Sequence, residues 1–242
     1  MKRLLAAGAD AIWQITRSFR RDETGRWHNA EFTIVEWYRT GWTHRQLMTE
    51  VADLCQQVCG WPTAEGLSYR NAFLRHAGID VASATDAELA ARAAAEGLDG
   101  AAATRDALLN FLLAALVEPK LGAERPCLLF DYPASQAALA KVRHEAFPVA
   151  ERFELYFRGV ELANGYHELT DPAELRRRNA EHNAARRRRA LRTFPEESRL
   201  LAAMDADFPA SAGVALGFDR LAMLALGATS LAEVVAFPFD RA

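Results

Sequence analysis

Two runs of aromatic and β-branched residues near the start of the chain constrain its fold more than any other feature. They lie within residues 11–38 and flank a polar loop that contains Asp22 and Gly25. Such runs around a loop are typical of an antiparallel hairpin, so we expect the chain to begin inside a sheet. Residues 44–58 carry apolar side chains at helical spacing, which predicts a helix packed on that sheet.

The rest of the chain alternates between short helical and strand-like segments. Residues 69–116 are rich in alanine and leucine, are broken at glycines, and predict several short helices that form a packing layer. A short strand is expected at 127–132, and a second hairpin at 152–164 is expected to turn at Arg158 and Gly159. Asp171, Pro172 and Glu174 have the form of a capped helix start. A strand over 213–219 and a helix from Arg220 complete the pattern.

Length and composition predict one globular domain. The chain has 242 residues, of which 50% are hydrophobic and 25% are charged. Its net charge of −3 argues against a protein that coats nucleic acid through bulk positive charge. We interpret Cys55, Cys59 and Cys127 as reduced thiols, because their number is odd and no histidine pair lies near them. No signal-peptide core or membrane-length apolar run is present, so we expect a cytoplasmic protein without a membrane partner.

Strand alternation predicts which side chains of the first hairpin share a face. On its second strand, Phe32, Ile34, Glu36 and Tyr38 lie on one side. That face offers an aromatic surface, a carboxylate and a phenol. Arg20 ends the polar face of the first strand just before the loop, and a guanidinium there suits a phosphate because its forked donors match phosphate oxygens.

The second hairpin is expected to bring two carboxylates together. With Arg158 and Gly159 as turn residues, Tyr156 pairs with Glu161 and Glu154 pairs with Ala163, so both glutamates share one face. Two converging acids favour a cation between them, and oxygen ligands suit Mg²⁺ that bridges a nucleotide. A solvated face with unrelated charges fits the same pattern, and this hairpin alone does not decide between the two.

Three segments resemble the lysine branch of the class II aminoacyl-tRNA synthetases. Motif 2 of that family is similar to residues 17–23 (RSFRRDE) and 26–38 (RWHNAEFTIVEWY), and motif 3 is similar to residues 213–221 (GVALGFDRL). The family's intervening strand is similar to residues 159–169 (GVELANGYHEL). The matches occur in the right order across most of the chain. The resemblance implies an α+β fold, in which an antiparallel sheet is flanked by helices, and the glycine-rich loop of phosphate-loop proteins is absent.

The resemblance also implies a role for each matching residue. Arg20 would bind the α-phosphate of ATP during in-line attack, and Arg220 would reach the terminal phosphate and sandwich the adenine against Phe32. Glu36 would bind the amine at the reacting end of the substrate, and Glu168 and Tyr38 would bind its side-chain ammonium. The implied catalytic residues are Arg20 and Arg220. The implied ATP contacts are Arg20, Asp22, His28, Asn29, Phe32, Glu161, Leu162, Gly217 and Arg220. The implied substrate contacts are Glu36, Tyr38, Asn164, Glu168 and Ala215, and the implied Mg²⁺ ligands are Glu154 and Glu161.

Within the family, the chain is most similar to the shorter relatives that modify elongation factor P. Ala215 stands where tRNA-charging lysyl enzymes usually have glycine, no anticodon-binding barrel is recognisable, and residues 130–140 and 234–242 are closer to that group. The resemblance implies that (R)-β-lysine or lysine is activated with ATP and Mg²⁺ and transferred to a lysine side chain of elongation factor P. A truncated lysyl-tRNA synthetase that charges tRNA and a non-catalytic binding module are the alternatives.

The resemblance also identifies departures from the family pattern. The segment that carries motif 1, the main homodimer contact, has no counterpart before Met1, so we expect an N-terminally incomplete catalytic domain over 1–242 that is weakly active or poorly folded by itself. Asp22 replaces the usual glutamate and shortens its reach towards ATP by one methylene. The arginine clusters at 176–178 and 186–189 form either an exposed helical face or a dock for an acidic partner, and Trp13, Trp37 and Trp42 are expected in the core.

Overall fold

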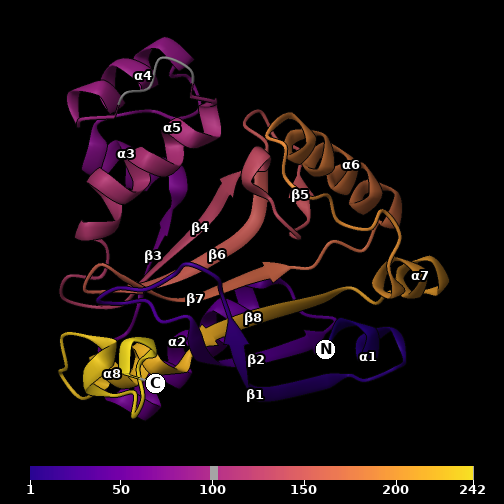
Figure 1. Ribbon diagram of the computed structural model, residues 1–242, viewed down its shortest axis with the longest axis horizontal. Coiled ribbons are helices and arrows are strands. Elements are labelled where there is room, and N and C mark those ends of the chain that lie inside the picture. Colours follow the sequence, from indigo (N-terminus) through magenta and orange to yellow (C-terminus); the bar gives the residue numbers. More distant parts are fainter. Residues whose placement is uncertain (99–102, 242) are drawn as a thin grey trace.

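The computed structural model describes residues 1–98 and 103–241, and these residues are built around one eight-stranded sheet. The strands run in the order β1-β2-β8-β7-β6-β4-β3, with β5 paired to β6 (Figure 1). Neighbours are antiparallel except β3 and β4, which are parallel. The strands are β1 (Ala11–Phe19), β2 (Glu31–Thr40), β3 (Glu65–Ser68), β4 (Cys127–Pro133), β5 (Val142–Arg143), β6 (Val149–Phe157), β7 (Val160–His167) and β8 (Ser211–Gly217). The predicted α+β class is confirmed.

Helices cover both faces of the sheet. The α-helices are α1 (Lys2–Ala6), α2 (His44–Cys59), α3 (Tyr69–Ala77), α4 (Asp86–Ala95), α5 (Arg105–Leu112), α6 (Pro172–Arg188), α7 (Arg199–Ala206) and α8 (Phe218–Ala225). Shorter helical turns are Leu113–Val117, Glu118–Lys120, Ala134–Gln136, Leu231–Glu233 and Phe239–Arg241. None of the described helices is both long and apolar enough to cross a membrane.

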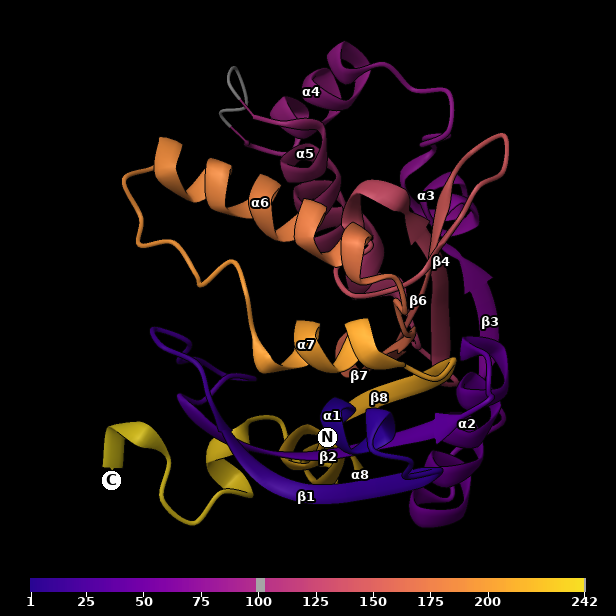
Figure 2. The same cartoon turned by 90° about the vertical axis from the view of Figure 1, so that its right-hand side faces the viewer.

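The two sheet faces are covered by different helices. Trp37 of β2 packs in one core cluster with Leu47 of α2 and Leu221 of α8. The next residue, Tyr38, points the other way and packs with Leu175 of α6 and Leu201 of α7. Figure 2 shows α6 and α7 on the inner side of the curved sheet. The inner face therefore carries the predicted site residues of β2, as strand alternation requires.

The local signals in the sequence account for most element boundaries. Thr43 caps α2 through a capping box with Gln46, and Gly60 ends the helix in the left-handed conformation. Asp171 caps α6 as predicted, with Pro172 in the first turn. Glu174 does not complete a capping box, because its carboxylate accepts hydrogen bonds from Arg177 and Arg178 instead. The strand predicted over 213–219 ends at Gly217, two residues earlier than expected.

The second hairpin turns as predicted, but its register changes along the strands. Arg158 and Gly159 both have positive φ, 52° and 74°, which fits a tight two-residue turn. Tyr156 pairs with Glu161 as expected, and then an irregularity shifts the register. Glu154 consequently pairs with Asn164 and not with Ala163. The predicted Glu154–Ala163 pairing is wrong, because a bulge turns Ala163 into the core and Asn164 towards the site.

The prediction for the three tryptophans is confirmed only in part. Trp37 is buried and Trp42 packs against the same core cluster. Trp13 is 72% exposed although it pairs with Trp37 and shares its sheet face, because β1 is an edge strand whose odd-numbered residues are left uncovered on that face. Aromatic residues suit both faces of a strand, so the composition of this run did not reveal which face was covered.

Candidate active site

Arg20 lies at the end of β1 with its guanidinium free to meet an anion. It stands over the Phe32 ring at 5.3 Å, and its side chain is 62% exposed. Its one ion pair, with Glu23, is long at 3.5 Å. An exposed pair of this length contributes little, so a phosphate would compete for Arg20 easily.

Arg220 reaches the same space from the start of α8. Its Nε donates to the Trp27 carbonyl at 3.0 Å and its Nη1 donates to the Glu161 carbonyl at 2.9 Å. The Glu161 carboxylate lies 3.7 Å from Nη1. Two backbone acceptors therefore fix the guanidinium plane, which leaves its positive charge available to a ligand.

One pocket gathers most of the predicted site residues. The predicted residues that line it are Arg20, His28, Asn29, Phe32, Glu161, Leu162, Asn164, Ala215, Gly217 and Arg220. Lining residues that the motif comparison did not supply include Glu23, Trp27, Thr33, Asp219 and Leu231. Asp219 accepts a hydrogen bond from the Thr33 amide at 2.7 Å and so fastens the start of α8 to β2. Residues far apart in sequence thus meet in a single cavity.

Two of the predicted ATP contacts, Asp22 and Asn29, do not offer a free side chain to the pocket. Asp22 does not line this pocket: its side chain is 85% exposed, beside Arg21, and its φ is 62°. Asn29 does line the pocket, but its amide is already used. It donates to the Glu31 carbonyl and accepts from the Phe239 amide, which ties the loop to the C-terminal segment. Asn29 therefore positions the loop in this structure.

His28 lines the pocket beside both arginines. Burial, followed by the nearby Arg220 charge, lowers the pKa of His28 below its ordinary value. A neutral imidazole is the consequence near neutral pH. The loop therefore presents a neutral, polar imidazole to the pocket while no anion is bound.

Glu36 on the inner face is held by two donors. Gln14 Nε2 donates to one carboxylate oxygen at 2.7 Å and the Tyr38 hydroxyl donates to the other at 2.6 Å. Burial and the neighbouring Glu168 raise the pKa of Tyr38 well above its usual range, so its hydroxyl stays a donor. In the sheet, Glu36 pairs with Ala215, which in turn pairs with Asn164. Ala215 thus lies between two predicted substrate contacts.

Glu168 follows β7 and is almost completely buried. Its Oε2 lies 2.5 Å from Nζ of Lys2, and the two side chains are 2% and 17% exposed. A methyl group at Gly213 would stand 2.3 Å from the Tyr38 ring and 2.7 Å from Glu168 Oε1. Glycine at 213 therefore leaves the space in which Tyr38 and Glu168 approach one another. Lys2 was not among the predicted site residues, because its place beside Glu168 depends on a contact across 166 residues.

The two predicted Mg²⁺ ligands have different surroundings. Glu154 is 5% exposed and accepts from four side chains. The donors are Tyr132, Arg152, Tyr156 and Asn164. Glu161 keeps 40% of its side-chain surface, and among the described residues its carboxylate has only the distant Arg220 contact. Glu161 thus has oxygen atoms free for a hard cation, whereas Glu154 is already satisfied.

A third carboxylate completes this acidic region. The Tyr156 hydroxyl lies 2.6 Å from Glu154 and 3.1 Å from Glu118. Glu118 follows a π-helical turn, and such turns are frequent at functional sites. Partial burial and the Glu154 charge raise the pKa of Glu161 above its ordinary value, against the opposing effect of Arg220. Glu118 lies in none of the family motifs, and only the fold brings it to this region.

A second group of side chains, on the outer face of the sheet, consists of residue types that can bind a metal ion. Single ligand atoms of His44, Glu151 and His167 lie within 4.8 Å of one another. Arg143, however, contacts both Glu151 and the adjacent Asp131. The carboxylate charge there is already compensated, so this group is an ion-pair network in the described residues.

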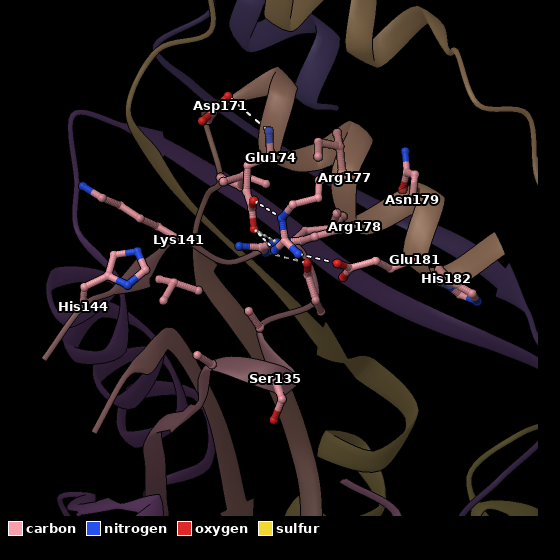
Figure 3. A pocket seen from close by; sticks show the side chains of 17 residues that line it. Ser135, Lys141, His144, Asp171, Glu174, Arg177, Arg178, Asn179, Glu181 and His182 are labelled. Atoms are coloured by element: carbon pink, nitrogen blue, oxygen red, sulfur yellow. Dashed lines mark hydrogen bonds and ion pairs between the residues drawn. The ribbon is translucent and has the colours of Figure 1, made fainter. Parts of the chain in front are cut away.

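A groove beside α6 contains part of the arginine-rich segment (Figure 3). Arg177 contacts Glu174 and Glu181, and Arg178 contacts Glu174 together with the carbonyls of Ala138 and Ala140. Arg176, outside the groove, contacts Glu197 and Asp205. The cluster at 176–178 is thus neutralised by the chain itself, which favours the exposed-face interpretation for Arg176 and Arg177, whereas Arg178 is only 16% exposed and ties α6 to residues 138–140.

Comparison with known proteins identifies the family. The model of the tRNA synthetases class II (D, K and N) matches residues 1–241. The chain belongs to this family. The family resemblance inferred from motifs 2 and 3 is therefore confirmed, and the inner-face pocket lies where those motifs meet.

Two curated relatives are similar over the whole chain. One, from Edwardsiella ictaluri (strain 93-146), is 52% identical over 245 residues, which cover 100% of this chain and 75% of the relative. The other, from Salmonella typhi, is 51% identical with the same coverage. Both relatives are named elongation factor P--(R)-beta-lysine ligase. They support the narrower resemblance drawn from Ala215 and the C-terminal segment.

Proposed function

We propose that this chain is an ATP-dependent ligase that activates (R)-β-lysine or lysine as an adenylate and transfers the acyl group to a lysine side chain of elongation factor P. The observation that carries the proposal is the arrangement of the inner sheet face: two arginines line the pocket, and two carboxylates outside its lining, Glu36 and Glu168, lie farther along the same face, where Glu36 pairs with the lining residue Ala215. The relatives' names supply the acceptor.

The arginine end suits phosphoryl chemistry. In the first step the substrate carboxylate forms a bond to the α-phosphorus of ATP, and the bond to pyrophosphate breaks. Arg20 would stabilise the charge that develops on the α-phosphate, and Arg220 would bind the terminal phosphate. Phe32, already stacked under Arg20, would offer its ring to the adenine. Arg220 is already oriented by two backbone carbonyls, and Arg20 has only a long ion pair with Glu23 to give up. The site therefore needs little rearrangement for this step.

The carboxylate end suits a diamine. (R)-β-Lysine and lysine each carry two ammonium groups, and Glu36 and Glu168 supply one negative charge for each. A buried carboxylate left without a cation is costly, so uncharged analogues of lysine would be rejected. In the second step the acceptor lysine amine attacks the activated carbonyl, AMP leaves, and an amide bond forms.

A Mg²⁺ ion would be held principally by Glu161, which has free oxygen atoms beside the phosphate-binding arginines. The ion would neutralise negative charge on the phosphates. Glu154 would support the site through Asn164 and Tyr156, because its oxygens are occupied by four donors. This assignment changes Glu154 from a predicted ligand into a residue that positions its neighbours.

Pyrophosphate exchange tests the first step. We expect ATP-dependent exchange with (R)-β-lysine, weaker exchange with lysine, and none with norleucine, which has no side-chain ammonium. Transfer is then measured to elongation factor P and to tRNA in parallel. Labelling of tRNA alone would identify a lysyl-tRNA synthetase, and absence of exchange with either amino acid would identify a non-catalytic module. Either outcome would contradict the proposal.

A further inference from the structure

The chain supplies its own lysine to the carboxylate that is proposed to recognise lysine. Lys2 Nζ lies 2.5 Å from Glu168 Oε2, and Glu168 is 1% exposed. An alkyl ammonium on this oxygen is chemically equivalent to the far end of the proposed substrate. The contact therefore occupies the position that the substrate ammonium would take.

We propose that Lys2 is a tethered competitor, which pairs with Glu168 in the free protein and must withdraw when the substrate ammonium binds. The inference rests on the proposed function, because it assumes that Glu168 receives that ammonium. Lys2 then sets the apparent affinity for the amino acid without taking part in bond formation.

Repulsion between cations argues that Lys2 leaves and does not share the site. Lys2 Nζ lies 2.5 Å from Glu168 Oε2, and Glu168 is almost completely buried. The substrate carboxylate would lie at the α-phosphate and not beside this oxygen. A second ammonium on Glu168 would therefore place two cations at short range in poorly solvated surroundings, where like charges repel strongly. Departure of Lys2 leaves one ammonium on one carboxylate.

The local structure allows the exchange. Lys2 is in the first turn of α1, whose backbone is anchored by Leu5 in the cluster that also contains Tyr38 and Leu201. The lysine side chain is 17% exposed, so part of it already borders solvent. A four-carbon stem can swing outwards while α1 stays in place, and water then solvates the ammonium.

The environment of Glu168 explains why a competitor is useful. Burial raises the pKa of Glu168, and Lys2 is the main opposing influence. Without a cation the free pocket would hold either a protonated acid or an unpaired charge. Lys2 supplies the cation at Glu168 Oε2 in the free protein, and the substrate ammonium would take its place.

The first test replaces Lys2 with methionine, which keeps the apolar stem and removes the charge. We expect Lys2→Met to lower the KM for (R)-β-lysine in pyrophosphate exchange by about tenfold, a typical size for removal of one competing contact, with a much smaller change in kcat. The matched control is Arg3→Met, since Arg3 is an exposed cation on the same helix. An unchanged or increased KM in Lys2→Met would overturn the inference.

The second test uses the unaltered protein and does not depend on the folding of a variant. Amine acetylation followed by mass spectrometry measures the reactivity of Lys2 with and without (R)-β-lysine. Withdrawal of Lys2 predicts protection in the free protein and increased labelling when the amino acid is bound, whereas Lys141 serves as the reference amine. Continued protection of Lys2 at saturating amino acid would show that it is a permanent counterion.

The two tests separate this inference from the proposed function. Wild-type protein that exchanges pyrophosphate, combined with an unchanged KM in Lys2→Met, overturns the inference alone. Protein that shows no exchange overturns the proposed activity, while the labelling experiment, which needs binding and no turnover, still decides whether Lys2 moves. Glu168→Gln adds a further distinction, because it should raise KM for the amino acid whether or not Lys2 competes.

Discussion

The two ends of the inner sheet face stabilise charged side chains in different ways. At the nucleotide end, which we define as Arg20, Phe32 and Arg220, Arg20 keeps 62% of its side-chain surface and has one weak ion pair. At the carboxylate end, defined as Glu36, Glu154 and Glu168, the acids are held by neighbouring donors or by Lys2. Water stabilises charge at the open end, whereas the buried end must supply its own partners. A ligand therefore adds contacts at the nucleotide end, whereas at the carboxylate end it replaces contacts that the protein already makes.

The largest effect is expected at the nucleotide end. Arg20→Ala should lower kcat/KM for pyrophosphate exchange by about a hundredfold to a thousandfold, because the lost donors face charge that develops in the transition state. Thermal stability should change little, since Arg20 is exposed. Arg17→Ala is the control on the same strand, where Arg17 is exposed and pairs with Glu31. Comparable activity of the two variants would contradict the role of Arg20.

The two glutamates of the second hairpin should separate stability from activity. Glu154→Gln is expected to lower the free energy of unfolding by about 3 kcal/mol, because it disturbs a buried carboxylate with four donors. Glu161→Gln should leave stability nearly unchanged and reduce Mg²⁺-dependent exchange. Urea unfolding and exchange assays on both variants provide the measurement. A stable Glu154→Gln protein that has lost Mg²⁺ dependence would identify Glu154 as the ligand instead.

A smaller effect is expected between the two ends, at Ala215. Ala215→Gly removes a methyl group that lies in register between Glu36 and Asn164. We expect the ratio of kcat/KM for (R)-β-lysine to that for lysine to fall by about tenfold, within the range for one methyl-sized change in a pocket. Ala212→Gly, on the opposite face of β8, is the matched control and should alter stability without altering this ratio. An equal change of the ratio in both variants would exclude a local effect of Ala215.

The smallest effect concerns His28 and pH. Its pKa is lowered in the free protein by burial and by Arg220, so phosphates that neutralise Arg220 should let this pKa rise. Protonated His28 favours an anion, and ATP affinity is therefore expected to increase by a few-fold as pH falls through the pKa of bound His28. Calorimetric titration of wild type and His28→Gln over pH 5–8 measures this. A pH dependence that persists in His28→Gln would assign it to another group.

How much the sequence predicted also differs between the two ends. The family resemblance named Arg20, Phe32 and Arg220, and the structure brings all three to one pocket, where each lies at or near the end of a strand or helix. The shared face of Glu36 and Tyr38 followed from strand alternation. Placing Glu36 and Tyr38 on one face needed only the two-residue repeat of a strand.

The carboxylate end depended on contacts that no local pattern contains. Lys2 meets Glu168 and Glu118 approaches Glu154 only when distant elements pack together. The predicted burial of Trp13 on the outermost strand was likewise wrong. Burial depends on which elements cover a sheet face, and the residues of the strand do not reveal this. Asp22 matched a motif but lies apart from the pocket in this structure.

The bulge between β6 and β7 makes chain length at this point as important as residue identity. Beyond it, Asn164 faces the site and Ala163 faces the core. A regular ladder that still contained Leu162 would exchange the two, sending an amide into an apolar layer and a methyl group to Glu154. The bulge therefore absorbs one residue, whereas a one-residue gap or insertion elsewhere in β7 would turn every position between it and Glu168 to the other face.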